Sequence, residues 1–166
     1  MPLEEAIRIA ADELYHSDLP PPCLTESSFI KLMRKVTAVV EFSFDEVMYR
    51  QTDGVAMGSP LGPVLANIFI GFHEQKLPLE DSTGVLFYRR DIDDTFSLNV
   101  SVEYSQKFLS VLNNLHSALE FTCEHEQNGR LPFLNNLVIH NPPVNLWVGF
   151  TMTIYCKPTF TGEYIR

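Results

Sequence analysis

The chain has 166 residues, of which 45% are hydrophobic and 20% charged, and its formal net charge is −9 at pH 7. This length and balance predict one folded domain with its own core and exclude an intrinsically disordered chain. The longest apolar run, residues 64–72, is too short to span a bilayer, and residues 1–5 lack the features of a secretory signal, so we expect an intracellular protein, in nucleus or cytoplasm, without a membrane partner.

The first 50 residues predict two helices and a hairpin. Between Pro2 and His16, apolar residues recur at helical spacing after a proline and two glutamates, which suit a helix amino end. Thr25 suits the cap of a second helix. Residues 41–51 predict a short hairpin around Asp45-Glu46. The second helix should bury one apolar face, made of Phe29, Leu32, Met33, Val36 and Val40.

The middle of the chain predicts a tight glycine-rich loop at residues 52–62, followed by a helix from about Pro60 to Gln75. That helix should place Leu61, Leu65, Ile68 and Phe72 on one face. Residues 85–99 predict two strands around a turn at Asp93-Asp94, and residues 102–116 predict a fourth helix.

The last third reads as strands. They cover residues 119–125, residues 131–140 after a turn at Asn128-Gly129, and residues 146–156. No repeat or linker divides the chain, so residues 1–166 form a single α+β domain in this interpretation.

Cysteines and histidines give no metal motif. The three cysteines are far apart and without a C-x-x-C pair, which predicts reduced, partly buried thiols. The five histidines form no i,i+4 pair and no H-E-x-x-H, so the pattern disfavours a histidine metal site.

The adjacent aspartates Asp93 and Asp94 are the first candidate site. At a hairpin tip they present paired carboxylates, the oxygen ligands that hard cations such as Mg²⁺ need. In two-metal phosphoryl transfer, ions about 3.5–4 Å apart activate the attacking oxygen and stabilise the leaving one. Asp-Asp is also ordinary turn chemistry with solvated charges, and the pair alone favours that plainer interpretation.

The glycine-rich loop is the second candidate. Glycines at 54, 58 and 62 allow backbone to approach a ligand closely. Ser59 as a cap and Pro60 in the first turn leave N–H groups pointing outward at the helix start. Such a loop suits a nucleotide or a template strand, and a glycine-rich turn before an ordinary amphipathic helix is the alternative.

Together these segments resemble motifs B and C of Penelope-like reverse transcriptases. The first is Gln51-x-Asp-Gly-Val-Ala-Met-Gly-Ser-Pro-Leu-Gly-Pro-x-Leu-Ala-Asn-Ile-Phe, and the second is Tyr88-Arg-Arg-x-Ile-Asp-Asp-Thr-Phe. Residues 121–134 resemble the family's next block, residues 155–162 its closing block, and residues 2–7 the helix after motif A. The match is collinear over nearly the whole chain.

The resemblance implies a right-hand polymerase fold: an antiparallel palm sheet with helices packed on one face and part of the fingers, with the first palm strand and the thumb missing. Residues 1–50 would be a helical part of fingers and palm, 51–76 the motif B loop and helix, 85–99 the motif C hairpin, and 100–166 the rest of the palm.

The implied activity is RNA-templated DNA synthesis by two-metal nucleotidyl transfer, using an RNA template, a DNA primer and deoxynucleoside triphosphates. Asp93 and Asp94 would be catalytic and would hold two Mg²⁺ ions, or Mn²⁺ in their place. Lys157 would either contact a phosphate or remain a solvated lysine. The nucleotide and template side would be lined by Gln51, Gly54, Met57, Gly58, Ser59 and Pro60.

The chain also departs from the family pattern. The motif A aspartate would precede the first residue, and Glu4 and Glu5, on a helix start, do not obviously replace it. Asp91 stands at an aromatic position and adds a third negative charge beside the pair. Cys156 and Asn135 replace a usual arginine and aspartate.

The net charge of −9 is unusual for a domain that binds nucleic acid, since such domains neutralise phosphates with Lys and Arg. We therefore expect no polymerase activity from these residues alone. The alternative is a non-catalytic retroelement remnant that acts, if at all, as a protein-binding module. An unpaired sheet edge would favour self-association.

Overall fold

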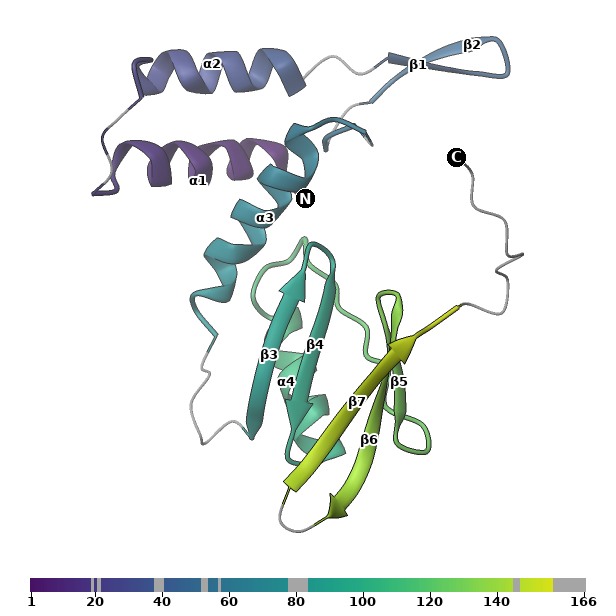
Figure 1. Cartoon of the computed structure of the whole chain (residues 1–166). Coiled ribbons are helices and arrows are strands. Elements are labelled where there is room, and N and C mark those ends of the chain that lie inside the picture. The colour runs from purple at the N-terminus through teal and green to yellow at the C-terminus, as the bar shows by residue number, and fades with distance from the viewer. Residues whose placement is uncertain are drawn as a thin grey trace.

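The computed structural model describes residues 1–18, 20, 22–37, 41–51, 54–56, 58–77, 84–144 and 147–156. Helices and antiparallel strands alternate along these ranges, which gives the predicted α+β class (Figure 1). None of the described helices is long and apolar enough to cross a membrane. The elements are α1 Leu3–Tyr15, α2 Glu26–Thr37, β1 Glu41–Phe44, β2 Val47–Arg50, α3 Leu61–Glu74, β3 Val85–Asp91, β4 Asp94–Asn99, α4 Val102–Asn113, β5 Arg130–Phe133, β6 Asn136–Val144 and β7 Trp147–Ile154.

The first three helices form one half of the molecule, with α1 packed against both α2 and α3 (Figure 1). Phe69 and Leu65 of α3 and Ile7 of α1 are fully buried, and each contributes about 1.5–3 kcal/mol through burial. Two small residues of α1, Ala6 and Ala10, are buried beside them, which lets α3 approach closely.

The helix faces differ in part from the predicted ones. In α2, Leu32 and Val36 are exposed, whereas Met33 and Thr37 are buried. The apolar residues of α2 are spread around more of the helix surface than α1 covers, so some of them remain exposed to solvent. In α3 the buried face is Leu65, Phe69 and His73 at i,i+4 spacing, because this ridge is the one that faces α1. Val40 lies outside the described residues.

The β3–β4 hairpin is confirmed, but its turn is one residue earlier than predicted. Asp91 pairs with Asp94 in the antiparallel register, so the turn is Ile92-Asp93 and Asp94 begins β4. Ile92 has φ of 54°, the left-handed conformation that tight hairpin turns require. A second core lies between this hairpin and α4, and its buried residues are Leu77, Phe108 and Leu112.

The C-terminal strands form a three-stranded sheet in the order β5-β6-β7. The turn at Asn128-Gly129 is confirmed, since both residues have positive φ and Gln127 bridges to Arg130. The single strand predicted for residues 131–140 is instead two strands, joined by a second turn at Leu134, whose φ is 55°.

The strand predicted for residues 119–125 is wrong. The side chain of Asn113 accepts a hydrogen bond from the Phe121 N–H at 2.6 Å and donates to the Phe121 carbonyl at 3.1 Å. A side chain thus satisfies both backbone groups that a neighbouring strand would otherwise pair. The three cysteines are free, as predicted, but they are exposed and not partly buried.

Candidate functional site

The tip of the β3–β4 hairpin carries a group of exposed carboxylates. Asp93 lies in the turn, and Asp94 begins β4 directly opposite Asp91. All three side chains are exposed, so their oxygens are available to solvent and to ions.

A half-buried network anchors this tip to α3. Arg90 donates from Nη1 to the Asn67 side-chain oxygen at 2.6 Å and to the Ile92 carbonyl at 2.9 Å. Its Nε lies 2.8 Å from Oε1 of Glu74, in an ion pair whose side chains are only 11% and 17% exposed. The turn and the helix are therefore held by one guanidinium, whose fork of donors suits several acceptors at once.

Tyr88 completes this network. Its hydroxyl donates to the same Glu74 oxygen at 2.6 Å. Burial, reinforced by the hydrogen bond to Glu74, raises the pKa of Tyr88 well above its usual range, so the hydroxyl stays protonated and remains a donor. The motif strings contain Tyr88, Arg90 and Asn67, but sequence spacing does not reveal which side chains contact one another. Their role in this network could therefore not be predicted.

The glycine-rich loop lies at the amino end of α3. Gly54 and Gly58 have φ of 82° and 86°, and a Cβ added at Gly58 would meet nothing within 4 Å. The helix begins at Leu61, whose N–H donates to the Ser59 hydroxyl at 3.3 Å. Ser59 therefore satisfies one N–H of the first turn, although Pro60 is the cap residue.

The predicted site residues are thus divided between two places. Gln51 lies close to Gly54, since its Nε2 would be 3.2 Å from a Cβ added there. In the described part of the chain, no hydrogen bond or ion pair joins Asp93 or Asp94 to the loop, and the connection runs through Asn67 of α3. Met57 and Lys157 lie outside the described residues.

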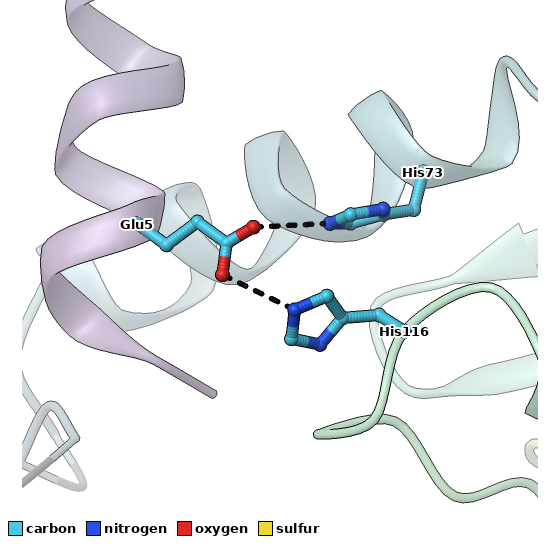
Figure 2. Close-up of side chains that lie close together, drawn as sticks. All are labelled: Glu5, His73 and His116. Atoms are coloured by element: carbon cyan, nitrogen blue, oxygen red, sulfur yellow. Dashed lines mark ion pairs between the residues drawn. The ribbon is translucent and has the colours of Figure 1, made fainter.

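A second cluster was not predicted. Figure 2 shows the carboxylate of Glu5, on α1, between the imidazoles of His73 and His116. Glu5 Oε2 lies 3.1 Å from Nε2 of His116, and Oε1 lies 3.8 Å from Nε2 of His73. His73 belongs to α3 and His116 follows α4, so three distant segments meet here. No local sequence signal marks such a cluster, because each residue comes from a different element.

The chain has no match among protein-family models, curated proteins or solved structures. The resemblance to Penelope-like reverse transcriptases therefore rests on the motif strings themselves.

Proposed function

We propose that the chain is a fragment of a reverse transcriptase domain of the Penelope-like type, with the palm and part of the fingers. The family activity is RNA-templated DNA synthesis. One observation supports this most: the two segments that carry the resemblance are in direct contact, through Arg90 of the second and Asn67 of the first, 2.6 Å apart. The helix α3, which follows the glycine-rich loop, is also followed directly by the carboxylate-tipped β3–β4 hairpin among the described elements.

Asp93 and Asp94 are the proposed metal ligands, with Asp93 in the turn as the principal one. Both are exposed carboxylates on an anchored tip, which fits the hard oxygen donors that Mg²⁺ or Mn²⁺ takes. When bound, the ions would activate the attacking hydroxyl and neutralise charge on the transferred phosphoryl group.

The fit is only partial. Among the described residues, no third His, Cys, Asp or Glu groups with this pair at metal-binding distance. A two-ion centre needs more oxygens than one hairpin supplies. We therefore propose weak ion binding and no polymerase activity for these residues alone.

The open side of the loop is the proposed contact for nucleotide and template. Gly58 and Pro60 are exposed and Ser59 is half-buried, so backbone can approach a phosphate or base without side-chain interference. Gln51 and Gly54 belong to the same proposed surface, and the resemblance assigns Met57 to it as well. RNA template, DNA primer and deoxynucleoside triphosphates are the corresponding partners.

The first test maps Mn²⁺ by paramagnetic broadening of backbone amide signals. The β1–β2 turn offers a matched control, because Asp45-Glu46 is also an exposed acidic pair at a hairpin turn. We expect selective broadening near 93–94, lost in Asp93→Asn and Asp94→Asn and unaffected by Asp45→Asn. Equal broadening at both turns would contradict a metal site and favour the solvated-turn interpretation.

The second test is primer extension on an RNA template with Mg²⁺ or Mn²⁺. We expect no templated incorporation by the chain alone, together with cross-linking of a primer–template duplex to the loop. Nucleotide incorporation above background would contradict the proposed lack of polymerase activity. A folded chain that neither cross-links nor binds Mn²⁺ selectively would favour the non-catalytic protein-binding remnant.

We also propose self-association through the β3–β4 hairpin. In the described residues each of these strands pairs only with the other, so their outer edges present unpaired N–H and C=O groups. A charge at exposed Leu86 of β3 should block edge pairing, so Leu86→Lys is expected to give a monomer in sedimentation. Val100→Lys, at a position that is also exposed but lies outside the strands, should leave the association unchanged. If the wild-type chain were a monomer at all concentrations, the proposed self-association would be wrong.

A further inference from the structure

The cluster of Glu5, His73 and His116 contains ligand atoms of the right kind and spacing for a transition metal. One ligand atom from each residue lies within 4.8 Å of the other two. The two oxygen–nitrogen distances involve different oxygens of Glu5, with Oε2 lying 3.1 Å from His116 and Oε1 lying 3.8 Å from His73. Ligands of a tetrahedral Zn²⁺ lie about 3.3 Å apart. Binding of one ion by all three residues would therefore require side-chain movement. It would also move the His116 proton from Nε2 to Nδ1, because Nδ1 accepts a hydrogen bond from the Ala118 N–H at 3.0 Å.

A simple ion pair with Glu5 accounts for His116 but leaves His73 unexplained. The His73 side chain is only 5% exposed, and neither of its ring nitrogens has a hydrogen-bond partner among the described residues. Buried polar atoms without partners are rare because they lose their hydration without replacement. A neutral imidazole with a free nitrogen lone pair is the form that binds a metal.

We propose that Glu5, His73 and His116 form a binding site for a divalent transition metal, with Zn²⁺ as the expected occupant. Two imidazole nitrogens and one carboxylate oxygen are the donor set of three-ligand zinc sites, which leave a fourth position for water. The same donors disfavour Mg²⁺, which prefers oxygen ligands throughout. The site is separate from Asp93 and Asp94 and does not depend on the proposed polymerase function.

The position of the cluster indicates that a bound ion would link separate elements of the fold. Glu5 and His73 belong to α1 and α3, whose buried residues form the first core. His116 follows α4, which packs on the hairpin through the second core. A metal bound here would therefore join the two halves of the molecule at the point where α1, α3 and the α4 end meet (Figure 2).

The test uses the whole chain, stripped with a chelator and titrated with Zn²⁺. We expect one ion per chain and, at a hundredfold excess over Kd, a melting temperature raised by about 5–10 °C. Mg²⁺ should give no such rise. Co²⁺ should give the intense visible bands of a tetrahedral site. Glu5→Gln, at a side chain that is 42% exposed, should abolish the rise and the bands, and His116→Asn should do the same.

His140 is the matched control. It lies 3.5 Å from the carboxylate of Glu126 but lacks a second histidine, so His140→Gln should retain Zn²⁺ binding. Exposed cysteines are competing ligands, and alkylating Cys23, Cys123 and Cys156 should leave the binding unchanged. Absence of binding, binding unaffected by Glu5→Gln and His116→Asn, or binding lost on alkylation would each overturn the proposal.

Discussion

Arg90 of β3 donates a hydrogen bond to the side chain of Asn67 of α3 across 2.6 Å, and the same guanidinium nitrogen also reaches the carbonyl of Ile92 in the hairpin turn. A helix and a turn separated by more than twenty residues are thereby fixed to each other. This contact determines where the carboxylates of Asp93 and Asp94 lie relative to the helix that follows the glycine-rich loop.

Replacing Arg90 should therefore cost stability. Arg90→Ala leaves the half-buried carboxylate of Glu74 without its cation, so we expect a loss of about 2–4 kcal/mol in the free energy of unfolding, measured in urea. Arg89 is the matched control, because it is exposed and, among the described residues, donates a hydrogen bond to the adjacent Tyr88 carbonyl and lies over the ring of Phe87, with no ion pair. Arg89→Ala should change stability by less than about 1 kcal/mol. Equal losses in the two variants would contradict the anchoring role.

The hydroxyl of Tyr88 should contribute separately. Tyr88→Phe keeps the ring contact with Phe108 and removes only the hydrogen bond to Glu74, so the expected loss is about 1–2 kcal/mol. Tyr104→Phe is the control, since its hydroxyl has no hydrogen-bond partner in the described part of the chain, and it should be nearly neutral. Because Tyr88 and Arg90 share one Glu74 oxygen, their double variant should deviate from additivity.

The same tyrosine predicts a dependence on alkaline pH. The folded protein raises the pKa of Tyr88, chiefly through burial, so the folded state holds this proton more tightly than the unfolded chain does. The stability from this group is complete below the ordinary tyrosine pKa of about 10 and is lost as pH rises above it. Unfolding free energies measured from pH 8 to 11 should therefore fall less steeply in Tyr88→Phe than in the wild type. Parallel curves would show that Tyr88 ionises equally in both states.

Two glycines with similar backbone angles should respond differently to alanine. Gly84 has φ of 67°, and an added Cβ would lie 2.4 Å from the ring of Tyr104, whereas at Gly58, with φ of 86°, it would meet nothing within 4 Å. Both changes impose the left-handed conformation on alanine, at about 1–2 kcal/mol. Gly84→Ala should lose about 1–3 kcal/mol more through overpacking, as thermal unfolding would show. A larger loss at Gly58 would mean that its loop is packed against something.

Local patterns were sufficient to predict the four helices and most of the strands. The buried faces of the helices were harder to predict, since the exposure of Leu32 and Val36 depends on how much of α2 is covered by neighbouring elements. Glycine and asparagine marked the turn at Asn128-Gly129, whereas the turn at Leu134 has a residue that rarely adopts positive φ and carries no such signal.

For the candidate sites, too, local sequence pattern does not reveal contacts between distant segments. Local pattern drew attention to Asp93 and Asp94 and to the glycine-rich loop, because each set lies in one short segment. The Glu5, His73 and His116 cluster is assembled by tertiary packing alone, from residues 68 and 43 positions apart in the chain. Motif spacing detects a site only when its ligands share an element or a repeated pattern.

Residues 119–125 do not form the predicted strand, and the contact that replaces the strand can be tested by mutation. Their apolar and β-branched residues suit a strand, but the Asn113 amide bonds both backbone groups of Phe121 and so replaces the strand partner. Asn113→Ala leaves these groups without that partner and frees the segment that packs Phe121 on the second core, so we expect a loss of about 1–3 kcal/mol and faster amide exchange at Phe121. Asn114→Ala is the control, because the Asn114 side chain, at the C-cap of α4, donates to the Ser110 carbonyl and to nothing else in the described ranges. If Phe121 exchanged equally slowly in both variants, another contact would have to fix this segment, and the asparagine would not explain the absence of the strand.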